Sequence, residues 1–128
     1  MNLLLIGIAG GLGAIARYST GALVEHYWPK DQFPWGTFIV NMIGCLLFGL
    51  VYALTEASQW APDTQERVRL FVLVGFMGAF TTYSTYAFQS AALLEESKWG
   101  LALWNIIGHT SIGLLVVFAG IWLGKTMS

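Results

Sequence analysis

Four long apolar stretches, with the charged residues placed between them, limit what this chain can form. They cover about residues 3–24, 36–55, 67–94 and 99–124. Each is long enough for the roughly 20 residues that cross the hydrocarbon core of a bilayer as an α-helix. Only 10% of the residues are charged, against about a quarter in an average soluble domain. The sequence therefore predicts an all-α integral membrane protein whose single four-helix domain covers residues 1–128.

The acidic residues all lie at the ends of these stretches or in the connections: Glu25, Asp31, Glu56, Asp63, Glu66, Glu95 and Glu96. A small multidrug transporter can share this size and span number, but it needs a carboxylate within a span to couple cations to protons, so this class is disfavoured. The sequence contains no nucleophile beside a base, no phosphate-binding loop and no metal motif, so we do not expect an enzyme. The six lysine and arginine residues are too few to predict nucleic acid binding.

Basic residues near the span ends influence which way a membrane protein inserts. Arg67, Arg69 and Lys125 fall on one side, while Lys30, Lys98 and, if its side chain reaches that interface, Arg17 fall on the other. A chain without a charge bias can insert both ways, and two opposite copies can then pair as an antiparallel homodimer. A monomer or a parallel oligomer remains open on this count alone.

The third stretch has a polar centre. Residues 75–88 read GFMGAFTTYSTYAF, in which Gly75 and Gly78 precede six consecutive hydroxyl side chains at 81–86. This composition is typical of an interrupted transmembrane helix, whose freed backbone groups must find partners because lipid offers none. Freed carbonyls suit a hard cation such as Na⁺, whereas freed N–H groups suit an anion. Hydroxyls bonded to their own helix are the simpler alternative.

The other polar residues within the spans include two pairs at helical spacing. Thr37 and Asn41 share one helix face, as do Asn105 and His109. Each pair can line a path or simply hold helices together. Arg17 is the one permanent charge within a span, and it needs water, carbonyl oxygens or an anion unless its long stem reaches the interface. Neutral donors beside one cation suit a small anion better than a cation.

Small residues indicate close helix packing in two other places. Gly7 and Gly11 in the first span have GxxxG spacing, with Gly10, Gly13 and Ala14 alongside, and Gly113, Gly120 and Gly124 share roughly one face of the fourth span. Residues of this size allow two helix backbones to approach closely in lipid. We therefore expect helix contacts on both faces.

Three segments resemble those of a known family: GGLGAIARY at 10–18, PWGTFIVNMIG at 34–44 and GFMGAFTTYSTY at 75–86. In this order and in a four-span chain, they resemble the fluoride-specific ion channels called Fluc, also known as fluoride exporters of the CrcB type. The resemblance implies passive fluoride export across a bacterial inner membrane by a dual-topology antiparallel homodimer. It also implies two pores, a broken third helix that crosses its partner near the midplane, and a central structural Na⁺ held by the backbone carbonyls of Gly78 and Thr81 in each subunit.

The resemblance implies an anion path as well. The pore arginine and asparagine of the family correspond to Arg17 and Asn41, and its paired pore phenylalanines correspond to Tyr83 and Tyr86. We expect the path to include these four and further polar residues of the spans, which gives Arg17, Thr37, Asn41, Tyr83, Ser84, Tyr86, Asn105 and His109.

Several positions depart from the family pattern. Phenylalanines are expected at Tyr83 and Tyr86, and the family often has Glu at Gln89, Tyr at Asn105 and Ser at His109. A divergent or engineered member with altered anion selectivity or throughput therefore remains open. So does a non-conducting membrane scaffold whose small-residue faces serve assembly only.

Overall fold

The computed structural model describes residues 1–29 and 32–128, which are helical over most of their length. The long helices α1 (Asn2–Tyr27) and α2 (Trp35–Ala57) come first, and α6 (Trp99–Met127) comes last. Between them lie four shorter elements: α3 (Pro62–Val68), η1 (Arg69–Met77), α4 (Gly78–Phe80) and α5 (Tyr83–Glu95). Lys30 and Asp31, which entered the counts of basic and acidic residues above, lie outside the described residues.

Within the described residues, four helical stretches are long and apolar enough to cross a membrane: Asn2–Tyr27, Trp35–Ala57, Pro62–Glu95 and Trp99–Met127. The third combines α3, η1, α4 and α5. Pro62 begins it at the first helical position, where the missing proline N–H is not needed for a helical hydrogen bond. The prediction of an all-α protein with four such helices is confirmed.

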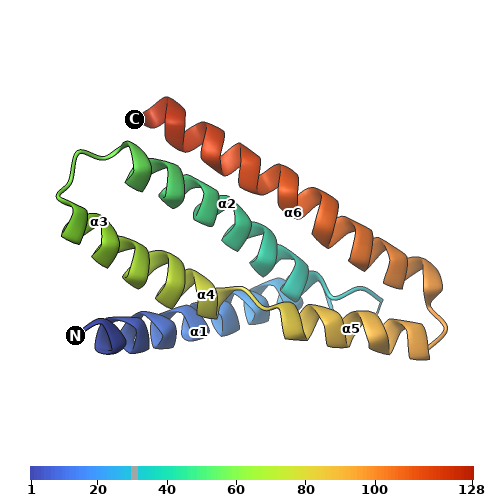
Figure 1. Cartoon of the computed structure of the whole chain (residues 1–128). Coiled ribbons are helices and arrows are strands. Elements are labelled where there is room, and N and C mark those ends of the chain that lie inside the picture. The colour runs from blue at the N-terminus through green and yellow to red at the C-terminus, as the bar shows by residue number, and fades with distance from the viewer. Residues whose placement is uncertain (30–31) are drawn as a thin grey trace.

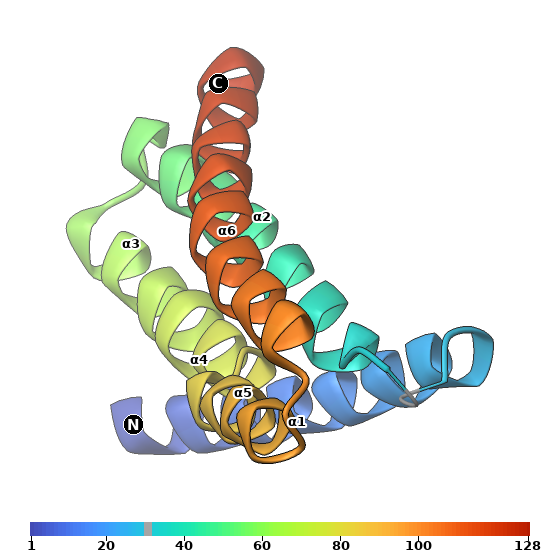
Figure 2. The same cartoon turned by 90° about the vertical axis from the view of Figure 1, so that its right-hand side faces the viewer.

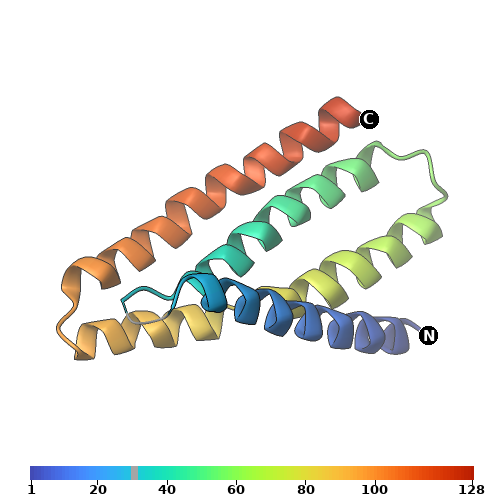
Figure 3. The same ribbon diagram turned by 180° about the vertical axis from the view of Figure 1, so that it is seen from behind.

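The helices run in two directions. α2 and α6 lie side by side and share one direction, whereas α1 and the elements from α3 to α5 run the other way (Figure 1). The axis of α5 is turned relative to that of α3 and α4, as the view from behind also shows (Figure 3). Figure 2 shows the C-terminal half of α6 rising away from α1. The turn between α4 and α5 places the start of α5 near the middle of the molecule.

Glycines bring α6 onto α2 at backbone distance. A Cβ atom at Gly49 would collide with the Val117 carbonyl, and one at Gly120 would collide with the Leu46 carbonyl. At Gly124 it would lie 2.6 Å from the Cβ of Ala53. The packing expected of Gly120 and Gly124 is thus confirmed, and it fixes the long seam between these two helices.

α1 approaches the third span closely at Gly13 and Gly75, and not at Gly7 or Gly11. A Cβ atom at Gly13 would collide with the Phe76 carbonyl, and one at Gly75 would lie 2.6 Å from the Cβ of Ala9. Gly7 and Gly11 have no described atom within 4 Å of such a position. The packing expected of Gly7 and Gly11 is therefore not made within one protomer.

Candidate functional site

The helical backbone of the third span is interrupted at two threonines. Thr81 has φ −85° and ψ 157°, and Thr82 has φ −148° and ψ 113°, so both are extended. The Oγ1 of Thr82 accepts a hydrogen bond from the backbone N–H of Thr85 at 3.3 Å, which caps the start of α5. The hydroxyl of Thr81 donates to the Met77 carbonyl at 3.0 Å. The two hydroxyls therefore serve the helix ends on either side of the interruption.

Asn41 of α2 holds the extended residue Thr82 through two hydrogen bonds. The Oδ1 of Asn41 accepts from the Thr82 N–H at 3.0 Å, and its Nδ2 donates to the Thr82 carbonyl at 3.2 Å. A single side-chain amide thus satisfies both backbone groups of Thr82. Asn41 is only 8% exposed, so the loss of either bond leaves a largely buried polar group without its partner.

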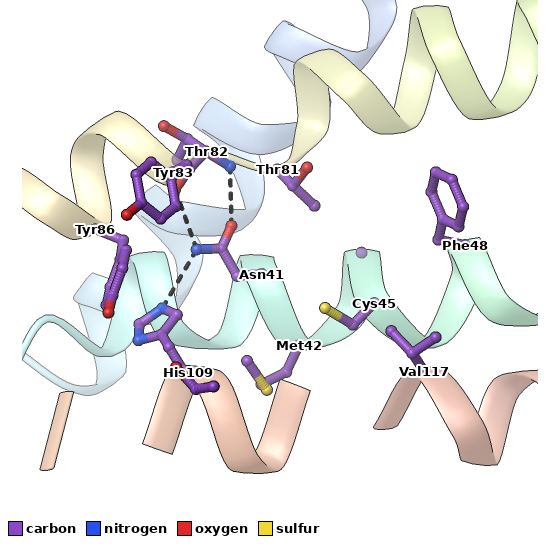
Figure 4. Close-up of a pocket in the computed structure, with 12 residues that line it drawn as sticks. Asn41, Met42, Cys45, Phe48, Thr81, Thr82, Tyr83, Tyr86, His109 and Val117 are labelled. Atoms are coloured by element: carbon purple, nitrogen blue, oxygen red, sulfur yellow. Dashed lines mark hydrogen bonds between the residues drawn. The ribbon is translucent and has the colours of Figure 1, made fainter. Parts of the chain in front are cut away.

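His109 of α6 continues this chain of hydrogen bonds (Figure 4). Its Nε2 lies 3.3 Å from the Nδ2 of Asn41, and its Nδ1 lies 3.0 Å from the backbone carbonyl oxygen of Asn105. The imidazole packs against the ring of Tyr86, with 4.4 Å between centroids, and lies edge-on to Phe38 at 4.9 Å. Polar residues from three separate spans therefore meet at the interruption.

These residues face a groove with a volume of about 420 Å³ (Figure 4). Its amide, hydroxyl and imidazole groups gather near the interruption, while its far end is apolar. Among the described residues it is lined by Asn41, Met42, Gly44, Cys45, Phe48, Thr81, Thr82, Tyr83, Tyr86, His109, Thr110 and Val117. None of these is acidic, lysine or arginine. A groove with neutral donors and no fixed negative charge is chemically suited to a small anion.

Arg17 lines a second hollow, of about 250 Å³, together with Thr37 and Gln89. Thr82 lines both hollows, so both of them reach the interruption. Glu25 also lines the second hollow, and its Oε1 lies 2.9 Å from the position of a Cβ on Gly36. Sequence reasoning did not select Glu25, although its spacing of eight residues from Arg17 on one helix places the two on the same face.

The remaining expected path residues lie in different surroundings. The ring of Tyr83 is 5.5 Å from that of Tyr86, and Tyr83 is 80% exposed. Ser84 is exposed, with its hydroxyl 3.5 Å from that of Thr82. Asn105 is fully buried and lines neither hollow. Its Nδ2 donates a hydrogen bond to the Oγ of Ser90 at 2.9 Å. Asn105 reaches the groove only through its carbonyl contact with His109.

The interruption removes the usual helical hydrogen-bond donors of the two carbonyls that were expected to hold a cation. In a continuous helix the Thr82 N–H would donate to the Gly78 carbonyl, and the Thr85 N–H would donate to the Thr81 carbonyl. Here the Thr82 N–H donates to Asn41 and the Thr85 N–H donates to the Thr82 hydroxyl. The carbonyls of Gly78 and Thr81 therefore lose these partners, and their oxygens are of the kind that a hard cation such as Na⁺ prefers.

Known proteins are similar to this chain over most of its length. The family model described as CrcB-like protein, Camphor Resistance (CrcB), matches residues 4–121. A fluoride-specific ion channel FluC from Nitrosococcus oceani is 44% identical over 115 residues, which cover 90% of this chain and 89% of the relative. One from Solidesulfovibrio magneticus is 43% identical over 120 residues, covering 94% and 93%. One from Maridesulfovibrio salexigens is 41% identical over 122 residues, covering 95% and 94%.

The matched range contains the interruption, the described lining of both hollows and most of each of the four apolar helices. The resemblance drawn from the three sequence segments is therefore confirmed. The chain belongs to the CrcB-like protein family.

Proposed function

We propose that this chain is the subunit of a fluoride-selective ion channel that lets fluoride cross a bacterial inner membrane passively. Relatives named fluoride-specific ion channels match it over nearly their whole length. They are channels rather than enzymes, so no covalent step is involved. The observation that carries the proposal is the interruption at Thr82, which is held by Asn41 and opens on a groove whose described lining has neutral donors and no carboxylate.

The anion path begins at the hollow that Arg17 and Thr37 line. Arg17 is a permanent cation there, and it attracts fluoride while the ion sheds part of its water. The ion then passes the interruption and enters the groove beside Tyr83 and Tyr86, whose O–H groups and positive ring edges contact an anion favourably. The hydroxyl of Ser84 and the imidazole of His109 complete the path, and Asn105, which is buried, takes part only through the contact of its carbonyl with His109. Selectivity comes from a narrow, poorly hydrated route whose donors match a small hard anion.

The working unit in this proposal is an antiparallel homodimer in which the broken third helices of two copies cross near the midplane. Ser84, Thr85 and Tyr83 are exposed in the isolated protomer, at the middle of an apolar span. Lipid offers no partners to their hydroxyls or to freed backbone groups, so another polar surface has to cover them. The same region of a second copy supplies such a surface, and the balanced basic residues allow insertion both ways.

A structural Na⁺ belongs to the same proposal. It lies between the two copies and is held by the carbonyls of Gly78 and Thr81 from each. Gly78 is exposed on the protomer, as a site shared between copies requires. When bound, the cation supplies positive charge that offsets the carbonyl dipoles at the interruption.

Efflux from liposomes tests the proposal. The purified protein is reconstituted, the liposomes are loaded with fluoride or with chloride, and ion-selective electrodes follow the loss of each ion. Rapid loss of fluoride with retention of chloride is expected, and liposomes without protein give the background. Equal loss of both ions would mean that Tyr83, Tyr86 or His109 has altered the selectivity. Retention of both by correctly folded protein would overturn the channel proposal in favour of a membrane scaffold.

A further inference from the structure

The hydrogen-bond chain from Thr82 to Asn105 fixes where the proton of His109 lies. At one end, the Thr82 N–H requires an acceptor, so the oxygen of the Asn41 amide faces it and the nitrogen faces His109. At the other end, the Asn105 carbonyl can only accept, so the Nδ1 of His109 carries the hydrogen. The Nε2 of His109 is then bare and accepts from Asn41. This is the neutral imidazole in one defined tautomer.

In this state the amide of Asn41 has no donor left for an anion. One hydrogen of its Nδ2 goes to the Thr82 carbonyl and the other goes to His109. Protonation of His109 places a hydrogen on Nε2, directly opposite Nδ2 at 3.3 Å. Two donors cannot bond to each other, so this contact has to open.

We infer that His109 is a proton-controlled positioning residue: when neutral it locks Asn41 to α6, and when protonated it releases the Asn41 N–H donor into the anion groove. This inference rests on the proposed fluoride channel function and adds a way in which pH regulates it. Release frees an amide donor, and the imidazolium adds a second donor with a positive charge to the same groove. Both changes favour an anion, so fluoride passage is faster when His109 is protonated.

Among the described groups around the groove, His109 is the one whose side-chain type ordinarily changes charge near neutral pH. α2 presents Phe38 and Asn41 to the ring, α5 presents Tyr86, and its own helix presents the Asn105 carbonyl. The other titratable side chains of the groove are Tyr83, Tyr86 and Cys45, and its described lining contains no carboxylate, lysine or arginine. Histidine is the type of side chain that ordinarily changes charge between about pH 5 and pH 8.

Fluoride efflux measured from about pH 5 to about pH 8, with the same pH inside and outside the liposomes, tests this inference. The wild-type rate is expected to rise on acidification by up to about tenfold over two pH units around the titration of His109, because the protonated fraction changes by about that much. Some fluoride becomes HF and crosses the bilayer unaided at acid pH, so protein-free liposomes are subtracted at each pH. A flat wild-type profile would overturn the inference.

Two variants separate the roles of the histidines. His109→Gln keeps an acceptor for Asn41 but cannot gain a charge, so its fluoride efflux should not vary with pH. His26→Gln removes the other histidine, which lies exposed at the end of α1, and should keep the wild-type profile. A profile that persists in His109→Gln, or disappears in His26→Gln, would contradict the assignment to His109.

Nitrogen NMR of the labelled wild-type protein in lipid nanodiscs tests the same link without any ion flux. The expected result is a bare Nε2 in neutral His109, and side-chain NH₂ signals of Asn41 that move as His109 titrates. A bare Nδ1, or Asn41 signals that stay constant through that titration, would overturn the inference even if fluoride passes. If no fluoride passes at any pH while the Asn41 signals follow His109, the channel proposal fails, but the coupling between the protonation of His109 and its contact with Asn41 stands.

Discussion

Asn41 of α2 and Thr82 of the third span exchange two hydrogen bonds, at 3.0 Å and 3.2 Å, although they are 41 residues apart in the chain. The side-chain amide of Asn41 pairs with the extended backbone of Thr82 much as one strand pairs with another. The position of the interruption along the membrane is thereby tied to α2. Gly44, one helical turn further along α2, leaves room for the methyl group of Thr81. The two polar bonds and this close contact together define the inner end of the groove.

Replacing Asn41 by aspartate is expected to lower fluoride efflux by about tenfold or more. A carboxylate has no N–H for the Thr82 carbonyl or for His109, and each buried group left without its partner costs about 1–3 kcal/mol. It also places a negative charge in the path of an anion. Asn2→Asp, at the exposed start of α1, is the matched control and should leave efflux unchanged. Wild-type efflux from Asn41→Asp liposomes would show that Asn41 has no part in the path.

Thr82→Val is expected to destabilise the protein by about 1 kcal/mol, because it removes the hydroxyl that caps α5. The same hydroxyl contacts that of Thr85 at 2.9 Å, so the start of α5 loses two bonds at once. Thermal unfolding in detergent gives the stability and liposome efflux gives the function. Thr82→Ser keeps the cap and should restore both properties. A Val variant as stable and as conductive as the Ser variant would contradict a capping role.

The four apolar helices could be predicted from the sequence because bilayer thickness imposes their length and composition directly. The backbone change at Thr81 and Thr82 falls inside the hydroxyl cluster for a related reason, since only residues that can satisfy freed backbone groups are tolerated there. The length and composition of a helix, and the hydroxyl side chains at its interruption, are properties of one segment, so they can be read from a single sequence.

The meeting of Asn41, Thr82 and His109 could not be predicted from helical spacing. It depends on how α2, α5 and α6 rotate against one another, and glycine contacts such as Gly49 with the Val117 carbonyl set that rotation. The same reason explains the first span, where Gly13 rather than the GxxxG pair meets the third span. Spacing indicates which residues share a face of a helix, but it does not say which face another helix covers.

Gly120→Ala is expected to destabilise the seam between α2 and α6 by about 1–3 kcal/mol, because the added methyl group collides with the Leu46 carbonyl and a helix backbone cannot move aside easily. The thermal midpoint of the purified protein is the measurement. Gly100→Ala is the control, because no described atom beyond its chain neighbours and the adjacent backbone of its own helix lies within 4 Å of its Cβ position. Equal midpoints for the two variants would mean that the helices adjust without cost.

Removal of Na⁺ is expected to lower the thermal midpoint if the carbonyls of Gly78 and Thr81 hold this ion. A ligand present at 100 times its dissociation constant stabilises a protein by about 2.7 kcal/mol, and this stabilisation disappears when the ion is replaced. The measurement compares unfolding in a sodium salt with unfolding in the N-methylglucamine salt at the same ionic strength. Equal midpoints would argue against a structural Na⁺ at the interruption.

Antiparallel assembly predicts that each end of the chain faces both sides of the membrane in equal amounts. Ser128→Cys places a thiol at the exposed C-terminus, and Cys45→Ser removes the natural one from α2. A maleimide reagent that does not cross membranes should label about half of the Ser128→Cys protein in intact cells and the rest after lysis, since a balanced set of basic residues gives neither orientation an advantage. Labelling only in intact cells or only after lysis would mean that the chain inserts one way. The polar centre of the third span would then have to be covered by a parallel partner or by another protein, because lipid cannot satisfy it.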